Sequence, residues 1–439
     1  MNLAGGGNSL ARIKNPLLKK YVSIYENVYM DYLEQVQAQG LSLDRDLNEE
    51  RNTLLAKLRL KGVSFRNAGK SIYLNWLSPA CEACRQGVGS VTFFLSLMCH
   101  RRCYYCFNPN QEGYAYYRRH LRDYRVELDQ LAKSGQKVSY IALTGGEPLL
   151  HRRETVDFFS LAKEKFPRAH TRLYTSGDLL DAELLQQLQK AGLTEIRFSV
   201  KLEDDFSSKQ KVYERMALAQ EYIRDVMVEM PVIPGTLQEM KELLLTLNTM
   251  GIKGINLLEF CFPFHNRESF QKRGFKIKNP PFLILYNYWY AGGLPVSKSE
   301  LECLELLDFA LAEQLKIGIH YCSLENKHTG QVYQQNFKHP KSDLLYFSPQ
   351  DYFLKTAKVF GDDIPLVLQR FKQKNVLKYK QNNEYQFLEF NVKNIRHLKG
   401  LDLEVGISSA ILEERSDGVV LRELKVDVIQ PDDFNLRDL

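Results

Sequence analysis

The order of apolar and polar positions changes character along the 439-residue chain. Residues 10–62 carry apolar side chains at helical spacing, as in LLKKYVSIYENVYMDYLEQVQ, with a break at Gly40. This pattern predicts a helical N-terminal extension at 1–75. From residue 91 the chain alternates short apolar runs with amphipathic stretches, which is typical of a parallel sheet covered by helices. We therefore expect an α/β fold.

The alternation predicts about six strand–helix units. The runs predicted as strands are 91–97, 139–145, 171–176, 195–200, 226–233 and 254–260. The stretches predicted as helices are 122–134, 153–165, 180–191, 209–222 and 236–250. A further helix at 299–315 and a strand at 318–323 complete a domain that we bound at 76–335.

Two parts of the chain depart from this rhythm. Residues 263–298 break the alternation and are predicted to be an insertion. Residues 336–439 predict a small α+β accessory domain, with a helix at PLVLQRFKQK and strands at YQFLEFNV, LEVGISSAIL and GVVLRELKVDVI. The last two runs flank Ser416-Asp417-Gly418, which predicts a hairpin turn.

Composition narrows the class of protein. Hydrophobic residues make up 44% of the chain, and no apolar run reaches the ~20 residues that span a bilayer. The N-terminus has no signal-peptide pattern, so we expect a cytoplasmic protein whose eight cysteines favour metal ligation over disulfides. The net charge of +6 neither requires nor excludes an anionic partner.

Three cysteines follow the first predicted strand in LSLMCHRRCYYCFNPN, at Cys99, Cys103 and Cys106. A structural zinc site or a closed iron–sulfur cluster uses four protein ligands, so three thiols suggest a metal centre with one open position. Three thiolates can hold three irons of a [4Fe–4S] cube. The alternative is a zinc site completed by His100 or by a distant cysteine.

A second motif, LTGGEPLL, ends the second predicted strand. The glycines Gly145 and Gly146 would let a ligand approach the backbone closely, and Glu147 can accept a hydrogen bond from an ammonium group. Both motifs thus fall at the carboxyl ends of strands, where the loops of barrel folds build active sites.

The CxxxCxxC spacing, the aromatic residue before the last cysteine and the GGEP segment one unit later resemble the radical S-adenosylmethionine (SAM) superfamily. The resemblance covers roughly residues 88–262. It implies a partial (β/α)6 barrel of the TIM type, a [4Fe–4S] cluster bound by the three cysteines, and SAM bound to the fourth iron. It further implies reductive cleavage of SAM to a 5′-deoxyadenosyl radical that abstracts hydrogen from a substrate.

The resemblance also assigns residues to SAM. Tyr105 would lie against the adenine, Pro148 would shape the turn, and Ser176 would stand where the family often has a polar residue. The amine would bind Gly145, Gly146 and Glu147, the ribose and carboxylate would lie near Ser199 and Lys201, and the adenine edge would contact Val232 and Ile233. The alternative for Ser176, Ser199 and Lys201 is that they are ordinary polar residues at strand ends.

Three other cysteines suggest a second metal centre, of the iron–sulfur, iron or zinc type. Cys81 and Cys84 form a CxxC pair in PACEACRQG, and Cys322 ends a late strand in GIHYCS. With the two motifs above, this combination resembles a poorly characterised radical SAM group related to pyruvate formate-lyase activating enzymes. The fourth ligand would be Cys261, His320 or the substrate. The alternative for Cys322 is a buried free thiol.

Two aromatic runs have structural explanations that we favour. YAYYRRH at 114–120 predicts a flap packed over the cysteine loop, with nucleobase stacking as the alternative. FLILYNYWY at 282–290 predicts core packing, with a substrate pocket or a dimer contact as the alternative.

The sequence leaves the substrate open. By analogy within the superfamily we expect a peptide or protein side chain, a one-electron donor such as ferredoxin or flavodoxin, and no membrane or nucleic-acid partner. The rivals are a small molecule or a tRNA, including cobalamin-dependent methyl transfer, and a noncatalytic iron–sulfur sensor. The intact GGEP segment argues against the sensor.

Overall fold

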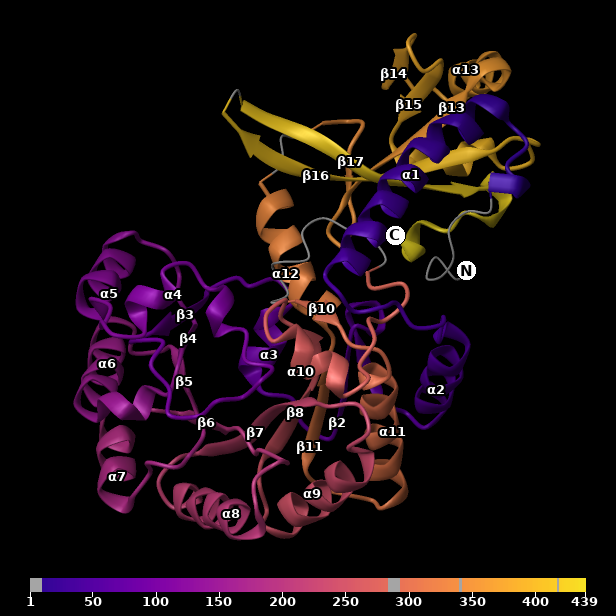
Figure 1. Cartoon of the computed structure of the whole chain (residues 1–439). Coiled ribbons are helices and arrows are strands. Elements are labelled where there is room, and N and C mark those ends of the chain that lie inside the picture. The colour runs from indigo at the N-terminus through magenta and orange to yellow at the C-terminus, as the bar shows by residue number, and fades with distance from the viewer. Residues whose placement is uncertain (1–9, 283–292, 339–341, 417) are drawn as a thin grey trace. The chain divides into compact units, whose positions relative to one another are not determined.

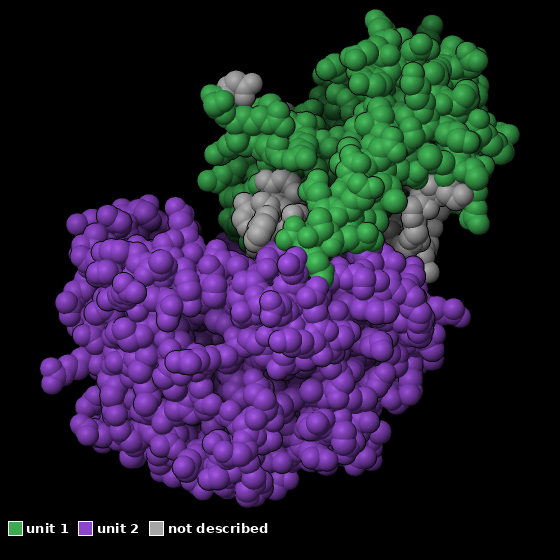
Figure 2. Space-filling view, in the orientation of Figure 1, with its two compact units in different colours: residues 1–40, 282–288, 328–439 green, residues 41–281, 289–327 purple. Residues whose placement is uncertain are grey.

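The structure is a computed structural model that describes residues 10–282, 293–338, 342–416 and 418–439. The chain divides into two compact units, which Figure 2 shows in different colours. Unit 1 comprises Met1–Gly40, Phe282–Tyr288 and His328–Leu439, and unit 2 comprises Leu41–Pro281 and Trp289–Lys327. Most of the aromatic run at 282–290 and the predicted turn residue Asp417 lie outside the described residues.

Unit 2 is built on a sheet with the strand order β1-β2-β11-β8-β7-β6-β5-β4-β3. Its centre is a parallel run in chain order: β3 (Ser90–Phe94), β4 (Tyr140–Thr144), β5 (His170–Thr175), β6 (Glu195–Phe198), β7 (Asp225–Val232) and β8 (Gly254–Glu259). The parallel strand β11 (Gly318–Cys322) extends it, and β2 (Ser71–Leu74) and β1 (Ser64–Arg66) add antiparallel pairs. The predicted partial barrel of the TIM type is confirmed.

The connections between the parallel strands contain helices, which Figure 1 shows along the outer side of the sheet. They are α5 (Tyr124–Lys133), α6 (Arg152–Lys165), α7 (Ala182–Lys190), α8 (Phe206–Gln220) and α9 (Leu237–Thr249), with α11 (Ser299–Ala312) before β11. In α7, for example, the Asp181 side chain accepts from the Leu184 amide at 2.8 Å and begins the helix, while Leu184, Leu185 and Leu188 form its buried face.

The remaining elements of unit 2 are short or peripheral. They are α2 (Asn48–Leu60), α3 (Pro79–Cys84), α4 (Tyr114–Tyr117), α10 (Arg267–Lys272), β9 (Cys261–Phe262) and β10 (Leu294–Pro295). Helix α4 belongs to the predicted flap: the Tyr117 ring packs on Phe94 at 5.3 Å between centroids, and its carbonyl accepts from the Leu97 amide at 2.9 Å. The flap therefore packs on the chain that leads into the cysteine loop.

Strand β3 ends at Phe94, three residues before the predicted end at 97. The next backbone groups bond to loops and not to β4: the Leu95 carbonyl accepts from the Arg122 amide at 2.8 Å, and the Ser96 carbonyl accepts from the Gly146 amide at 3.0 Å. The apolar pattern continues because Leu95 and Leu97 are buried, although the ladder has ended.

Unit 1 contains an antiparallel sheet with the order β14-β15-β13-β16-β17, and β12 pairs with β13. The strands are β12 (Tyr346–Phe347), β13 (Leu354–Phe360), β14 (Tyr379–Asn382), β15 (Phe387–Phe390), β16 (Val405–Arg415) and β17 (Gly418–Ile429). The helices are α1 (Pro16–Ala38) and α13 (Ile364–Gln373), and α12 (Leu324–Asn336) crosses the boundary between the units. The predicted hairpin is present, since Arg415 pairs with Gly418.

The division into units differs from the predicted boundaries at 75 and 335. Helix α1 belongs to unit 1 because Leu18, Tyr21 and Val22 pack against Phe360 and Phe387 of that unit. Helix α2 belongs to unit 2, where Lys57 and Lys61 form ion pairs with Asp308 of α11 at 2.7 and 2.6 Å. No described helix is long and apolar enough to cross a membrane.

Candidate active site

Side chains from the carboxyl ends of the parallel strands line a cavity of about 540 Å³. This volume lies in the range of small-molecule sites. Of the residues assigned to the cluster and SAM, the lining includes Cys99, Cys103, Tyr105, Cys106, Gly145, Gly146, Glu147, Ser176, Ser199 and Lys201. The two sequence motifs therefore meet on one cavity, although some 40 residues separate them in the chain.

The three thiols come from one loop after β3. The Cys106 amide donates to the Cys103 carbonyl at 3.1 Å, which closes a turn, and the Arg101 amide donates to Cys99 Sγ at 3.4 Å. Burial raises the pKa of Cys99, and the nearby Glu147, Cys103 and Cys106 raise it further. The thiols thus lie close enough to interact electrostatically, and all three border the cavity.

This arrangement fits a [4Fe–4S] cube. Among the residues that the structure describes, no three His, Cys, Asp or Glu side chains converge on a point that could hold a single metal ion. Thiolates that bind three different irons of one cube need no such convergence. The zinc alternative gains no support, since His100 Nε2 instead contacts Asp178 Oδ2 at 2.6 Å. All eight cysteines are free thiols.

An arginine clamp fixes the cysteine loop. The Arg101 guanidinium donates to Asp178 at 2.7 Å and to Asp204 at 2.9 Å, so the loops after β5 and β6 hold the loop after β3. Burial raises the pKa of Asp178, but Arg101 and His100 outweigh it and hold the pKa at about 2. This clamp was not predicted from the sequence, because neither Asp178 nor Asp204 belongs to a motif.

The two glycines of GGEP have a packing role. A Cβ atom at Gly146 would lie 1.8 Å from the Met98 carbonyl oxygen, and one at Gly145 would lie 2.6 Å from Ser96 O. The Glu147 amide donates to that Met98 carbonyl at 2.8 Å. We predicted glycines to admit a ligand. The structure shows that they make room for the backbone leading into the cysteine loop, and their contact with a ligand stays a prediction.

The Glu147 carboxylate is buried, at 3% exposure, and accepts four hydrogen bonds from protein groups. One oxygen accepts from the Leu149 amide at 3.1 Å and from Thr175 Oγ1 at 2.7 Å. The other accepts from the amide and the hydroxyl of Ser176, both at 2.8 Å. Glu147 therefore joins the end of β4 to the end of β5, and its contact with the SAM amine stays a prediction.

Three of the residues predicted to contact adenosine gather on one wall. Lys201 Nζ donates to Ser199 Oγ at 2.8 Å and lies 5.4 Å from the centroid of the Tyr105 ring. The Tyr105 ring also contacts the rings of Tyr104 and Phe260, at 5.0 and 5.7 Å between centroids. The wall offers an aromatic face, a cation and a hydroxyl, which are groups that suit a nucleoside and a carboxylate.

Val232 and Ile233 are not among the residues that line the cavity, and their contact with the adenine edge stays a prediction. Successive side chains of a strand point to opposite faces. In β7 the cavity side is taken by Glu229 and Pro231, so Val232 points the other way and is fully buried. Pro148 is buried and begins a short turn, as predicted for a residue that shapes the loop.

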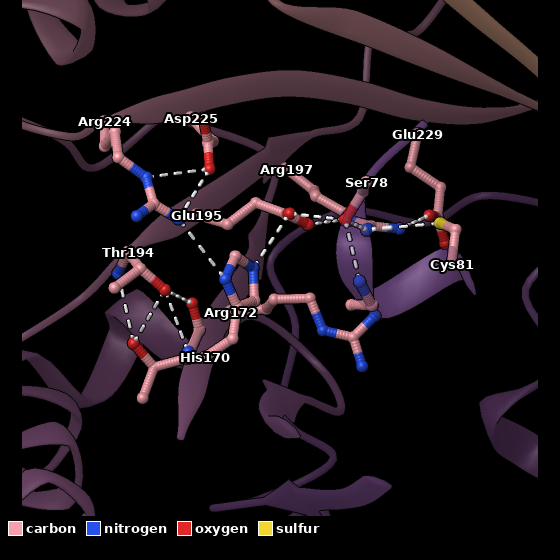
Figure 3. Close-up of polar contacts among 12 residues, drawn as sticks. Ser78, Cys81, His170, Arg172, Thr194, Glu195, Arg197, Arg224, Asp225 and Glu229 are labelled. Atoms are coloured by element: carbon pink, nitrogen blue, oxygen red, sulfur yellow. Dashed lines mark hydrogen bonds and ion pairs between the residues drawn. The ribbon is translucent and has the colours of Figure 1, made fainter. Parts of the chain in front are cut away.

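A buried charge network borders the cavity, and Figure 3 shows its members. Arg197 is 2% exposed and donates to Glu195 and to Glu229. It also donates to Ser78 Oγ at 3.0 Å and to Cys81 Sγ at 3.4 Å. The network thus connects the cavity wall with the CxxC helix α3.

The charges of this network stabilise one another. Burial raises the pKa of Glu195, but Arg197, His170 and Ser78 outweigh it and hold the pKa at about 2. Burial likewise raises the pKa of Glu229, and Arg197 with Asn256 lowers it overall. A charged residue inside an apolar strand, as in EIRF and VMVEMPV, is the sequence signal that could have revealed these lining residues.

Another lining residue that sequence reasoning missed is Lys327, early in α12. Burial lowers the pKa of Lys327, but interactions with Cys322, Cys261, Glu229 and Cys84 outweigh it and raise the pKa. This lysine therefore lies between the cavity and several of the remaining cysteines.

The thiols assigned to a second metal centre do not line the cavity. Cys81 is buried in α3, Cys84 is exposed at the last residue of that helix, and Cys322 is buried at the end of β11. Burial raises the pKa of Cys322 to about 12, with added repulsion from Cys84 and Cys81. Cys303 belongs to the apolar core.

Comparison with known proteins places the two motifs in a family. Residues 94–247 match the model of the radical SAM superfamily. A putative glycyl-radical enzyme activating enzyme of Methanocaldococcus jannaschii is 28% identical over 211 residues, which are 46% of this chain and 55% of that protein. The PqqA peptide cyclase of Granulibacter bethesdensis is 30% identical over 105 residues, which are 24% of this chain and 27% of that protein.

Among solved structures, SuiB of Streptococcus suis bound to the precursor peptide SuiA aligns with a TM-score of 0.40 and 13% identity, covering 76% of this chain and 68% of that chain. The matched part of this chain spans about half or less of the length of the two curated relatives. The family match includes the cysteine loop and the GGEP segment, and it confirms the resemblance. Residues 94–247 of this chain therefore match the radical SAM superfamily, whose cofactors are SAM and a [4Fe–4S] cluster.

Proposed function

We propose that this protein is an enzyme that cleaves SAM reductively and abstracts hydrogen from a side chain of a peptide or protein. One observation carries the proposal: the three thiols and the GGEP segment of the family match border the same cavity. The two curated relatives are named for activating a glycyl-radical enzyme and for cyclising a peptide. Both names support a polypeptide substrate.

The cofactors, when bound, supply the one-electron reduction that releases the radical. The side chains of this protein would hold the cofactors in position. Cys99, Cys103 and Cys106 would hold the cluster, and the clamp of Arg101 with Asp178 and Asp204 would keep their loop in place. The wall of Tyr105, Ser199 and Lys201 would orient the nucleoside part of SAM.

The cavity also provides surroundings in which a radical survives. Leu258, Phe260 and Pro231 contribute apolar lining, which limits the access of water to the reacting atoms. The charged lining residues Glu229, Arg197 and Lys327 would orient polar groups of the substrate. We expect a ferredoxin or flavodoxin to supply the electron in the cytoplasm.

The primary test is SAM cleavage. Protein reconstituted anaerobically with iron and sulfide should release 5′-deoxyadenosine from SAM in the presence of dithionite. Cys103→Ala should abolish the release because it removes a cluster ligand, whereas Cys303→Ala should retain it because this thiol lies in the apolar core. Equal release by the Cys103→Ala protein would contradict the proposal.

A second experiment identifies the substrate class. Candidate polypeptides with deuterated side chains should transfer deuterium into 5′-deoxyadenosine. Transfer from a labelled tRNA or small molecule, and not from any polypeptide, would favour the rival substrates. The first test is unaffected by either result, so substrate class and SAM chemistry are judged separately.

A further inference from the structure

The fold brings three thiols together that are far apart in the sequence. Strand β2 pairs antiparallel with β11, and Cys322 lies opposite Ser71. Helix α3 follows β2 and places Cys81 so that its Sγ accepts from Asn256 Nδ2 of β8 at 3.1 Å. Asn256 Oδ1 also contacts His320 Nδ1 of β11 at 2.9 Å, so Asn256 links Cys81 to the strand that ends at Cys322, and Cys84 ends the helix that carries Cys81. We call Cys81, Cys84 and Cys322 the thiol cluster.

Nitrogen donors point at two sulfurs of the thiol cluster. Cys81 Sγ accepts from Asn256 Nδ2 at 3.1 Å and from Arg197 Nη2 at 3.4 Å, and Cys322 Sγ accepts from Asn326 Nδ2 at 3.3 Å. A neutral thiol is a weak acceptor, whereas an anionic metal-bound sulfur is a good one. Hydrogen bonds of this kind to ligating sulfurs tune metal–thiolate sites.

Cationic side chains surround the thiol cluster. Arg197 contacts Cys81, Lys327 interacts with Cys84 and Cys322, and Arg172 interacts with Cys84. Arg172 is 7% exposed, and its Nε has no hydrogen-bond partner among the described residues. A buried guanidinium with an unpartnered donor is costly unless a negative group lies nearby. These cations would balance a centre built from several thiolates.

We propose that Cys81, Cys84 and Cys322 bind a second thiophilic metal group, either an iron–sulfur cluster or a zinc ion. His320 does not serve as a ligand: its Nε2 contacts Ser71 Oγ and its Nδ1 contacts Asn256 Oδ1, each at 2.9 Å. Lys327, which interacts with Cys322 and Cys84, also lines the cavity. The site is separate from the family's own cluster and does not depend on SAM cleavage.

Metal binding would draw the thiols closer than they stand, because no single-ion geometry is found in the part of the chain that the structure describes. Cys84 is the thiol that would move. This residue is exposed and ends a six-residue helix, whereas Cys81 and Cys322 are held by buried donors.

The test uses full-length protein with Cys99, Cys103 and Cys106 replaced by Ala, so that the family's cluster cannot form. After anaerobic reconstitution with iron and sulfide, or with zinc alone, and desalting, this protein should retain metal. Equal amounts of iron and sulfide would identify a cluster, and zinc alone would identify a single ion. Adding Cys84→Ser, the exposed thiol and thus the mildest change, should lower the retained metal at least fivefold.

A matched control separates ligation from general loss of a thiol. Cys303→Ser in the same protein should retain the metal, because this buried thiol belongs to the apolar core. The proposal is overturned if the protein without the family's cluster binds no more metal than its Cys84→Ser version, or if Cys303→Ser lowers the metal as much as Cys84→Ser. Far-UV circular dichroism confirms that each variant is folded. SAM cleavage is not measured, so failure here leaves the proposed function intact.

Discussion

At the residue scale, Glu147 shows how a motif residue can serve the fold. Its two oxygens already accept from Leu149, Thr175 and Ser176. A carboxylate offers about four acceptor positions, so an ammonium group would share oxygens that are already bonded. Glu147 thus orients the Thr175–Ser176 end of β5 toward the cavity whether or not it contacts SAM directly.

The first prediction follows from these four bonds. Glu147→Gln keeps the shape of the side chain but turns one acceptor into an NH2 group that opposes a protein donor. We expect SAM to bind roughly tenfold more weakly, which corresponds to ~1.4 kcal/mol. Isothermal titration under anaerobic conditions measures the affinity, and an unchanged visible spectrum of the cluster serves as the control. Unaltered SAM affinity would show that Glu147 does not contribute to SAM binding.

A second prediction concerns the buried Glu195. Its pKa of about 2 in the folded protein lies below its value of about 4.3 in an unfolded chain, so its ion pair with Arg197 stabilises the fold above pH ~4.3. This contribution is lost as the pH falls toward 2. Between pH 5 and 2.5, the free energy of unfolding should therefore fall further in the unmutated chain than in Glu195→Gln. The additional loss expected from proton linkage is on the order of 2–3 kcal/mol.

Urea unfolding followed by circular dichroism measures this difference. The comparison is made in protein with Cys99, Cys103 and Cys106 replaced by Ala, so that acid loss of the cluster does not contribute. Parallel pH curves for the two proteins would show that the Glu195 carboxyl is not held ionised.

The sequence predicts a role well when that role depends on neighbouring residues in the chain. It predicts a role less well when that role depends on the face of the strand to which the side chain points. The three thiols and GGEP were placed correctly on one cavity because both follow buried strands directly. Val232 does not line the cavity, because the side chains of β7 alternate and the cavity face falls on Glu229 and Pro231. Counting the alternation outward from Glu229, an anomalous charge in an apolar strand, would have excluded Val232.

At the element scale, the cysteines and the GGEP segment lie on the loops after β3 and β4, beside side chains from the ends of the strands. The predicted strands 139–145 and 195–200 are present with ends shifted by a few residues. The contact between the loops after β3 and β4 was not predictable, because it depends on the Met98 carbonyl filling the space beside Gly146. Sequence shows that a glycine is present, and only the fold shows what its missing side chain makes room for.

A third prediction tests this loop contact. Gly146→Ala places a Cβ 1.8 Å from Met98 O, so the GGEP loop or the cysteine loop must shift. We expect overpacking to destabilise the fold by about 1–3 kcal/mol and SAM cleavage to be lost. Gly235→Ala is the control, because its Cβ would meet nothing within 4 Å and only its φ of +92° is strained. Thermal unfolding and 5′-deoxyadenosine release are measured for both, and normal SAM cleavage by Gly146→Ala would contradict the packing role.

At the scale of the whole molecule, contacts between distant parts of the chain decide which segments fold together. The helical pattern at 10–62 predicted one extension, yet α1 joins unit 1 and α2 joins unit 2. The apolar stripes of the two helices look alike in sequence. The two helices differ in the surface against which they pack. For α1 this surface comes from residues more than 300 positions later in the chain. Likewise, the proximity of Cys322 to Cys81, which the sequence suggested only through a resemblance, depends on the pairing of β2 with β11.

The last prediction follows from this division. A chain truncated to 1–338 keeps α1 but lacks Phe360 and Phe387, which cover Leu18, Tyr21 and Val22. Each uncovered side chain forgoes about 1.5–3 kcal/mol of burial, so the apolar stripe should drive self-association. A chain truncated to 41–338 lacks the stripe and keeps the main apolar core of unit 2, whose buried members lie between Leu55 and Tyr321. We expect it to be monomeric and to release 5′-deoxyadenosine from SAM. Size-exclusion chromatography with light scattering compares the two, and equal numbers of chains per particle would show that α1 needs no cover from unit 1.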